Sequence, residues 1–311
     1  MDTSVRIGQL VLANPVGAAS GTIGFGEEYA GLVDLDALGA LYTKAVTPEP
    51  RAGNPVPRLA DTPAGMLNSI GLANPGLDAF VADKLPFLRG LRCAVMVNVA
   101  GAAADDYVRV VERLEAEDGV HGYEINVSCP NVEHGGMALG TDARAVERLT
   151  RRLADAAASG ARARGRAQRP VVVKLSPNVT DICDTARAAE TGGADAVSCV
   201  NTLVGMVIDV ARKRPVLARG QGGLSGPAIR PVGVAAVYKV SRAVAIPVIG
   251  LGGITNADDA LQYLLAGAQA VQVGTALFNR PETPAEVLAG IVGFMEREGV
   301  RRPADLRLLL A

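Results

Sequence analysis

The segment "PVIGLGGITNADDALQYLLA", Pro247 to Ala266, carries the pattern that decides the fold. It opens with a short apolar run, which is typical of a buried β-strand, and closes with apolar residues at helical spacing. Asn256 is a good helix N-cap, and Asp258 and Asp259 favour a helix N-terminus electrostatically. The segment therefore predicts a strand over Pro247–Gly253 and a helix over Asn256–Ala266.

The same strand-then-helix pattern recurs along the chain. Apolar runs predict eight strands, at Pro15–Ser20, Ala40–Ala45, Cys93–Val99, Tyr123–Val127, Val171–Leu175, Ala196–Asn201, Pro247–Gly253 and Ala270–Thr275. Amphipathic patterns predict helices between them, for instance at Asp105–Ala116, Asp142–Arg164, Thr180–Thr191, Pro231–Ala243 and Asn256–Ala266, with N-caps at Thr141 or Asp142, at Thr180 and at Asn256. The count and the alternation favour a single α/β domain over residues 1–311, a (β/α)8 or TIM barrel, rather than an open doubly wound sheet.

Three segments fall outside this repeat. The alternating "VRIGQLVL" at residues 5–12 predicts a short N-terminal β-hairpin that plugs the bottom of the barrel. Residues 48–76 are too rich in Pro and Gly for a helix, so they predict a long loop above the second strand. Residues 205–226 predict a second hairpin with a glycine-rich exit. Both insertions follow strands and are expected at the C-terminal face, where long loops are usually functional.

Composition limits the classes of partner. The chain has 311 residues, with 31 Lys and Arg against 32 Asp and Glu, so neither nucleic acid nor anionic lipid is an expected partner. Its four cysteines, Cys93, Cys129, Cys183 and Cys199, form no C-x-x-C pair, so neither a disulfide framework nor a metal site is predicted. Without a recognisable signal peptide or membrane-spanning stretch, a cytoplasmic protein with reduced thiols is expected.

Polar residues or glycines end all of the predicted strands. They are Ser20, Lys44, Asn98, Asn126, Lys174, Asn201, the pair Gly252 and Gly253, and the pair Gly274 and Thr275. In a barrel the C-terminal strand ends meet at one mouth, where the chemistry of such folds is found. Because an amide or a charge at that mouth is costly unless paired, the convergence predicts one polar ligand site rather than separate loop anchors.

The glycines in "GLGGI" and "VGTA" allow backbone N–H groups to approach a phosphate, which barrels often bind after strands seven and eight. Lys44 and Lys174 can add positive charge, and Asn98 and Asn126 can hydrogen-bond a planar ring. A reduced flavin gains negative charge near N1 and its C2 carbonyl, which a lysine would stabilise. The pattern suggests flavin mononucleotide (FMN), with pyridoxal phosphate and a plain sugar phosphate as alternatives.

The stretch "YEINVSCPNV", Tyr123 to Val132, places Cys129 just past a predicted strand and above the mouth. Glycines at 135, 136 and 140 suit a hinged lid, and Asn126 and Asn131 can bind amides and carbonyls of a substrate. A thiol with a pKa of about 8.5 is roughly a few per cent thiolate at neutral pH, so Cys129 is the candidate base. By contrast, the patterns predict buried thiols at Cys93, Cys183 and Cys199 and loop residues at His121 and His134.

Segments throughout the chain resemble the class 1 dihydroorotate dehydrogenases, and most of all the catalytic subunit of the class 1B, NAD-linked form. The matching segments are "ASGTIGFGEEYA", "TKAVTPEPRAGNPVPR", "GMLNSIGLANPG", "INVSCPNVEHGG", "VKLSPNVTDI", "VNTLVGMVIDV", "GGLSGPAI", "IPVIGLGGI" and "AVQVGTALF". The resemblance implies oxidation of (S)-dihydroorotate to orotate in pyrimidine biosynthesis. Cys129 would remove the C5 proton while hydride passes from C6 to flavin N5.

The resemblance also implies which residues form the site. FMN would be surrounded by Ser20, Lys44, Ala45, Asn98, Asn126, Lys174, Val200, Gly226, Gly252, Gly253, Gly274 and Thr275. Dihydroorotate would be held by Lys44, Asn68, Ser69, Ile70, Gly71, Leu72, Asn126, Asn201 and Thr202, with Asn131 close by. Cys129 takes the place of the family's catalytic base.

The route by which electrons leave is indicated by what the sequence lacks. There is no G-x-G-x-x-G after a strand and no cysteine cluster, so the electrons are expected to leave through a partner. The resemblance implies a subunit carrying FAD and a [2Fe-2S] cluster, joined to a homodimeric core as a heterotetramer, with NAD as final acceptor. The alternatives are a fumarate-linked class 1A enzyme, a dihydropyrimidine dehydrogenase-like flavin barrel and, more distantly, a non-redox phosphate-binding barrel.

Overall fold

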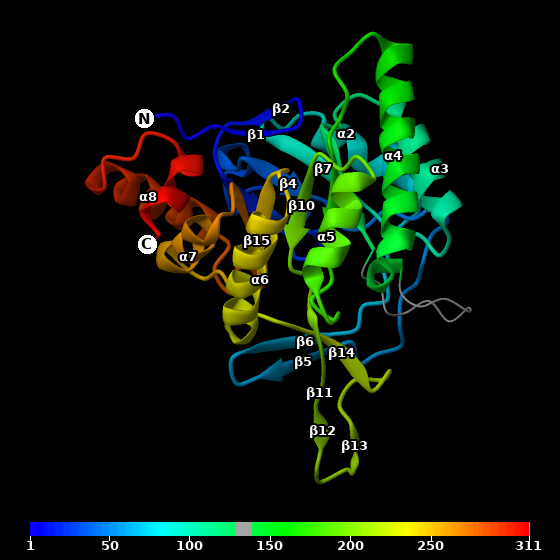
Figure 1. Ribbon diagram of the computed structural model, residues 1–311. Helices are drawn as coiled ribbons and strands as arrows, with labels where there is room; N and C mark the ends of the chain where they lie inside the picture. The colour runs from blue at the N-terminus through cyan, green and yellow to red at the C-terminus, as the bar shows by residue number, and fades with distance from the viewer. Residues whose placement is uncertain (128–138, 311) are drawn as a thin grey trace.

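The protein is described by a computed structural model over residues 1–127 and 139–310. Its centre is a closed barrel of parallel strands (Figure 1). In order around the barrel they are β3 (Val16–Ala18), β4 (Ala40–Tyr42), β7 (Ala94–Val99), β8 (Gly122–Asn126), β9 (Val171–Lys174), β10 (Ala196–Cys199), β15 (Val248–Leu251) and β16 (Ala270–Val273). Every predicted strand coincides with one of them. The predicted (β/α)8 barrel is therefore confirmed, and the open-sheet alternative is wrong.

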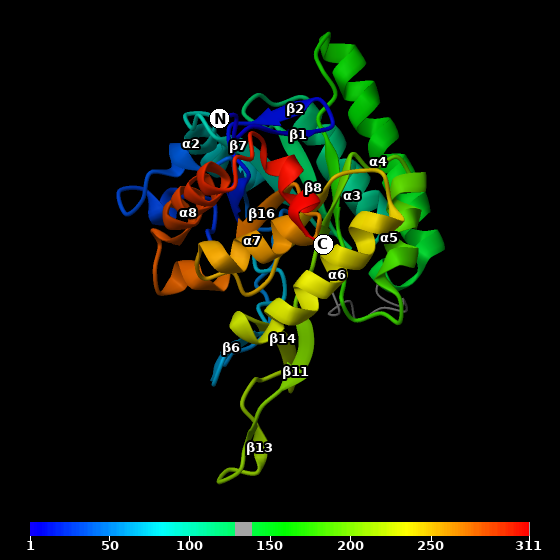
Figure 2. The same ribbon diagram turned by 60° about the vertical axis from the view of Figure 1, so that its left-hand side comes forward.

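The barrel strands are buried on both faces. Their inward side chains, such as Met96, Val172 and Ile249, form an apolar cluster that fills the end of the barrel interior nearer the N-terminal hairpin. Their outward side chains, such as Val97 and Val173, belong to a larger apolar cluster, and Figure 2 shows helices on the outside of the barrel strands. Parallel strands covered on both sides have near-continuous apolar sequences, which is why the strand pattern could be recognised.

The helices surround the barrel. They are α1 (Leu77–Ala79), α2 (Leu85–Leu88), α3 (Ala104–Glu115), α4 (Ala143–Arg164), α5 (Ile182–Thr191), α6 (Arg230–Ala243), α7 (Ala257–Ala266) and α8 (Thr283–Arg297). Shorter turns are η1 (Glu27–Tyr29), η2 (Leu35–Ala37), the π-helical η3 (Phe80–Lys84), η4 (Leu139–Thr141), η5 (Pro227–Ile229), η6 (Thr275–Phe278) and η7 (Pro303–Leu309). Within the described ranges, no helix has both the length and the apolar character needed to cross a membrane.

The N-caps explain where the predicted helices begin. Asp142 accepts a hydrogen bond from the Arg144 N–H at 2.9 Å, and Asn256 accepts one from the Asp259 N–H at 3.0 Å. The sequence predicts that helix α5 starts at Thr180, but its cap is Asp181, whose carboxylate accepts from the Cys183 N–H at 2.9 Å. Asp and Thr are both good caps, so the sequence does not distinguish the adjacent positions.

The N-terminal hairpin closes one end of the barrel, as predicted. Strands β1 (Val5–Ile7) and β2 (Leu10–Leu12) pair antiparallel, and the turn between them contains Gly8 at a φ of 56°. The side chains of Val5, Ile7 and Leu12 join the apolar cluster inside the barrel. Figure 1 shows this hairpin at the opposite end of the barrel from the inserted strands.

The two insertions form a single antiparallel sheet below the barrel in Figure 1. Its order is β11 (Leu203–Met206), β14 (Gln221–Ser225), β6 (Gly65–Asn68) and β5 (Leu59–Thr62), and a small hairpin of β12 (Ile208–Asp209) and β13 (Arg214–Pro215) extends from it. The predicted second hairpin is confirmed. The prediction that residues 48–76 form only a loop is wrong, because they contain the β5–β6 hairpin, which is completed by pairing with the distant β14.

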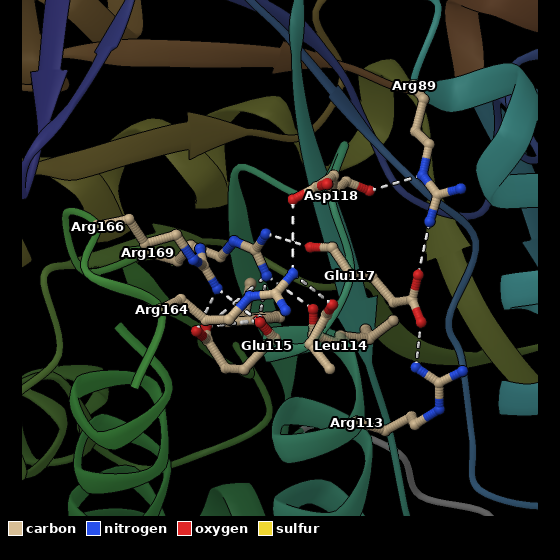
Figure 3. Close-up of polar contacts among 11 residues, drawn as sticks. Arg89, Arg113, Leu114, Glu115, Glu117, Asp118, Arg164, Arg166 and Arg169 are labelled. Carbon is tan, nitrogen blue, oxygen red and sulfur yellow. Dashed lines mark hydrogen bonds and ion pairs between the residues drawn. The ribbon is translucent and has the colours of Figure 1, made fainter. Parts of the chain in front are cut away.

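A network of ion pairs fastens the outer elements near the N-terminal ends of β8 and β9 (Figure 3). Glu115, at the end of α3, is 3% exposed and pairs with Arg166 at 2.5 Å. It also accepts a hydrogen bond from the Tyr123 hydroxyl at 2.7 Å. Arg169 donates to the Leu114 carbonyl at 2.7 Å, so the loop after α4 is tied to α3 and β8.

The hairpin plug yields a stability prediction. Ile7 is 1% exposed, so Ile7→Ala should leave a cavity and lower the free energy of unfolding by about 2–5 kcal/mol. Val11 is in the same hairpin but is 49% exposed, so Val11→Ala should change the free energy of unfolding by less than about 0.5 kcal/mol. Urea unfolding followed by circular dichroism measures both values, and equal losses would contradict the packing of the plug.

Candidate active site

The C-terminal strand ends and the inserted sheet enclose a cavity of about 650 Å³. Every described residue that was predicted for the site lines this cavity. These residues are Ser20, Lys44, Ala45, Asn68, Ser69, Ile70, Gly71, Leu72, Asn98, Asn126, Lys174, Val200, Asn201, Thr202, Gly226, Gly252, Gly253, Gly274 and Thr275. Cys129 and Asn131 lie outside the described residues, as do His134 and the glycines at 135 and 136.

Two lysines bring positive charge to the cavity. Lys174, the last residue of β9, is 5% exposed, and its Nζ lies 3.1 Å from Ser20 Oγ. Lys44 follows β4 and is half-buried, and its backbone N–H donates to the Gly24 carbonyl at 2.8 Å. Burial lowers the pKa of Lys44, whereas the carboxylate of Glu28 opposes that shift. Arg219 also lines the cavity, so three cationic side chains make it suited to a ligand that carries negative charge.

Asn98, Ser20 and Lys174 are linked by hydrogen bonds and form the floor of the cavity. Asn98, on β7, is 1% exposed and donates from Nδ2 to Ser20 Oγ at 3.3 Å. The same Nδ2 lies 2.7 Å from a carboxylate oxygen of Glu124. Asn98, Glu124 and Lys174 lie on barrel strands, so the strands fix their positions, and Ser20 reaches them from the turn that follows β3.

Glu124 is a buried group that the sequence analysis missed. It lies on β8, is 0% exposed and pairs with Lys174 at 3.4 Å. Burial alone would raise the pKa of Glu124, but the charge of Lys174 and the hydrogen bonds from Gln272 and Asn98 outweigh burial and lower it. The available signal was its spacing of two residues from Asn126, which puts both side chains on the inner face of the strand.

One wall of the cavity is formed by residues 68–72. Gly71 and Leu72 both have a positive φ, of 74° and 57°, which is an uncommon conformation for a leucine. Buried Asn54 holds this segment by donating to the Ser69 carbonyl at 3.1 Å, and buried Asn74 donates to the Leu72 carbonyl at 2.7 Å. The wall therefore keeps a strained shape because two side-chain amides support it.

A second wall of the cavity joins the ends of β8 and β10. Asn201 Nδ2 donates to Asn126 Oδ1 at 3.2 Å, and the Thr202 N–H donates to Asn201 Oδ1 at 2.9 Å. The backbone carbonyl of Asn126 accepts from the Tyr107 hydroxyl at 3.0 Å. These bonds hold the amides of Asn126 and Asn201 at the cavity, where they can bind the polar edge of a ligand.

Glycines shape the third side of the cavity. Gly252 and Gly253 have positive φ values of 127° and 69°, and a Cβ on Gly253 would lie 2.7 Å from the Gly226 carbonyl oxygen. Gly274 is the N-cap of the short turn η6, and Thr275 donates from Oγ1 to Ser225 Oγ at 2.8 Å. The backbone can thus come close to a ligand after β15 and β16, the position at which such barrels often bind phosphate.

Other lining residues were not foreseen. Ser176 and Asn178 follow β9, Gln221 and Ser225 belong to β14, and Gln272 lies on β16. Gln272 is two residues before Gly274 and was therefore identifiable from strand periodicity, as Glu124 was. The β14 residues could not be identified in this way, because they reach the cavity through the inserted sheet.

The described cysteines, Cys93, Cys183 and Cys199, are not among the residues that line the cavity. Cys93, Cys183 and Cys199 are buried, as predicted. Burial raises the pKa of the Cys93 thiol to about 12, and it also raises the pKa of Cys199. His121 lies in the loop before β8, as predicted, and its Nδ1 accepts from the Val95 N–H at 3.0 Å. None of these groups is placed to act on a ligand in the cavity.

Comparisons with known proteins give the family. The family model described as dihydroorotate dehydrogenase matches residues 3–295. The "Dihydroorotate dehydrogenase B (NAD(+)), catalytic subunit" of Desulforamulus reducens is 49% identical over 300 residues, 96% of this chain and 95% of the relative. The proteins of the same name from Trichlorobacter lovleyi and Listeria monocytogenes are 50% and 47% identical, over 99% and 98% of this chain and 97% of each relative.

The solved structures support the fold independently. The dihydroorotate dehydrogenase of Eimeria tenella, solved in complex with ferulenol, superposes with a TM-score of 0.80 at 22% identity, covering 100% of this chain and 88% of that one. At this identity the likeness concerns the fold alone. The family match and the curated relatives, which cover nearly the whole chain, show more: the chain belongs to the dihydroorotate dehydrogenase family, as an enzyme similar to the catalytic subunits of its NAD-linked B form.

Proposed function

We propose that the protein oxidises (S)-dihydroorotate to orotate with FMN bound in the barrel cavity, as a cytoplasmic step of pyrimidine biosynthesis. The observation that carries the proposal is the meeting of two lysines, three strand-end asparagines and the glycine pairs of β15 and β16 around one cavity. Its volume of about 650 Å³ is within the range of roughly 300–1,000 Å³ usual for small-molecule sites.

The residues present fit FMN. Gly252, Gly253, Gly274 and Thr275 would hold the phosphate, because their backbone permits close approach and the position after β15 and β16 favours it. The floor formed by Ser20, Asn98 and Lys174 would face the ring, with a cation available for charge that develops near N1 and the C2 carbonyl. Ala45, Val200 and Gly226 would complete the surroundings. When bound, FMN supplies the hydride acceptor.

The substrate would occupy the space between the two walls. Dihydroorotate is an anion with two amide carbonyls, so Lys44 matches its carboxylate and the amides of Asn68, Asn126 and Asn201 match its ring. The strained 68–72 wall, with Ser69, Ile70, Gly71 and Leu72, is held in shape before any ligand binds, which lowers the cost of ordering it. Thr202 would close the opposite side, with Asn131 close by.

Cys129 would act as the base. The chain reaches it two residues after Val127, directly beyond the cavity residue Asn126. As a thiolate, Cys129 would take the proton from C5 of dihydroorotate, which leaves the C5–H electron pair to form the C5–C6 double bond as hydride leaves C6. The polar walls hold the substrate during this step and limit access of water.

Electrons would then leave through a partner subunit that carries FAD and a [2Fe-2S] cluster and reduces NAD, in a heterotetramer with a homodimeric core. The supporting observation is that the relatives at 46–50% identity are named catalytic subunits of the NAD-linked form. Adding that partner should give NAD-dependent dihydroorotate oxidation, with fumarate a poor acceptor. Rapid turnover with fumarate and none with NAD plus the partner would support the class 1A alternative instead.

The direct test of the proposed function uses the purified chain. It should be yellow, release FMN on denaturation at about one per chain, and lose its flavin absorbance near 450 nm when dihydroorotate is added anaerobically, as expected for hydride transfer to a bound flavin. Dihydrouracil, which lacks the carboxylate, is the matched control and should bleach the flavin far more slowly. A colourless protein would rule out the flavin assignment and favour a non-redox barrel.

The base assignment has its own test. Cys129→Ser should retain FMN but lower the rate of flavin reduction by dihydroorotate about 10²-fold or more, because a serine hydroxyl is a far weaker acid than a thiol at neutral pH. Cys183→Ser is the control, since Cys183 lies in α5 and is not among the residues that line the cavity, and should reduce flavin at the wild-type rate. Stopped-flow absorbance measures both rates. An unchanged rate in Cys129→Ser across pH 6–9 would eliminate Cys129 as the base.

A further inference from the structure

We propose that Glu124 is a positioning residue that sets the electron affinity of the bound flavin, by holding Lys174 in place and partly neutralising its charge. This inference rests on the proposed function, because it assumes that FMN occupies the cavity. Glu124 is not a lining residue of the cavity, whereas its partners Lys174, Asn98 and Gln272 are. Its influence on a ligand would therefore act through them.

The carboxylate of Glu124 is surrounded by donors from other barrel strands. Oε2 accepts from Asn98 Nδ2 at 2.7 Å and from Lys174 Nζ at 3.4 Å. Oε1 accepts from Ser198 Oγ at 3.1 Å and from Gln272 Nε2 at 2.9 Å. The partners come from β7, β9, β10 and β16, so one acid joins four strands at the level just beneath the cavity.

Barrel closure alone does not require this acid. The inward positions nearer the plug are apolar, as Met96, Val172 and Ile249 show, and they fill the barrel without any charge. Taking a carboxylate and an ammonium out of water costs several kcal/mol per ion, and apolar residues of similar volume often serve stability as well or better. A fully buried acid beneath a ligand cavity therefore indicates a role in the chemistry above it.

The charge of Glu124 opposes the effect of Lys174. A lysine beside a flavin favours the reduced form, since reduction places negative charge on the ring, whereas a nearby carboxylate disfavours it. Glu124 remains ionised because its pKa is lowered by the same partners that surround it. The pair would therefore fix the position of Lys174 and also moderate its attraction for electrons.

This moderation suits an enzyme that must pass its electrons onward. An unopposed buried cation would hold the reduced flavin too strongly for rapid transfer to an acceptor. With Glu124 in place, Lys174 can still hydrogen-bond the ring while the net charge of the pair is close to zero. The proposal therefore links a buried ion pair in this chain to the reoxidation half of its reaction.

The test is Glu124→Gln, which removes the charge and preserves the shape. The oxygen of the new side-chain amide can accept from Asn98 and Lys174. The nitrogen of that amide would face Gln272. Gln272 Oε1 is buried and has no hydrogen-bond partner among the described residues. If the Gln272 amide rotates, this oxygen can accept a hydrogen bond from the new nitrogen. The readouts are FMN content, the midpoint potential of the flavin, and the Kd for sulfite, which adds to flavin N5 and leaves negative charge on the pyrimidine side.

In FMN-loaded Glu124→Gln the midpoint potential of the flavin should rise, and the Kd for sulfite should fall about tenfold or more. This is the size of effect expected when one charge is removed at a distance of several ångströms, at an effective dielectric constant of about 20. Glu124→Asp keeps the charge on a shorter side chain and should stay closer to the wild-type Kd than Glu124→Gln does. A purely structural role predicts the reverse order, because Gln matches the shape of Glu better than Asp does.

Glu115→Gln is the matched control. Glu115 is also a buried acid paired with an arginine, but it lies in the network at the N-terminal ends of the strands (Figure 3). Its loss should lower the free energy of unfolding and leave both the potential and the sulfite Kd unchanged. A shift in Glu115→Gln as large as that in Glu124→Gln would overturn the proposal, because the effect would then be general rather than specific to the cavity floor.

The outcomes separate this inference from the proposed function. Wild-type protein without FMN would defeat the proposed function, whereas FMN-loaded Glu124→Gln with wild-type potential and sulfite affinity would defeat only the role of Glu124. If Glu124→Gln does not fold, the neutral pair Glu124→Gln with Lys174→Gln takes its place, and its sulfite Kd should exceed that of the wild type. An equal Kd in the double variant would show that the pair exerts no net field on the flavin, and a lower Kd would show that the pair disfavours negative charge there, so either result would contradict the proposal.

Discussion

Closure of a parallel sheet is the constraint on which the rest of the structure depends. Because all the barrel strands run in one direction and the last pairs with the first, residues far apart in the chain must end at the same mouth. Ser20 and Lys174 are 154 positions apart, yet their side chains lie within 3.1 Å. The site therefore follows from the topology as much as from any local motif.

The barrel interior is divided along its axis by polarity. Near the plug, apolar side chains such as Met96 and Ile249 fill the space and stabilise closure. Nearer the C-terminal strand ends, Asn98, Glu124 and Lys174 replace them with a hydrogen-bonded layer that is costly to bury. Stability and chemistry thus occupy different levels of the same strands, so changes at one level can be studied with limited effect on the other.

The sequence was informative wherever a local rule applied. Strands buried on both faces have continuous apolar runs, and a barrel places their last residues together, so positions such as Lys44 and Asn126 could be predicted. The β5–β6 hairpin could not, because it depends on pairing with β14 about 155 residues later, as between Asn68 and Gly223. Glu124 was missed for a different reason. Strand periodicity indicates that its side chain points into the barrel, but it does not indicate which side chains surround it there.

The inserted sheet also explains glycines that no turn requires. A Cβ on Gly222 would lie 2.6 Å from the Asn68 carbonyl oxygen, and one on Gly223 would lie 2.1 Å from Thr202 Oγ1. A larger residue at Gly222 would press on the backbone of Asn68 in the neighbouring strand β6, and one at Gly223 would press on the side chain of Thr202. The barrel supplies the floor of the cavity, and the bare backbone of β14 lets its walls come together above that floor. Two insertions that are distant in sequence thereby act as one structural unit over the site.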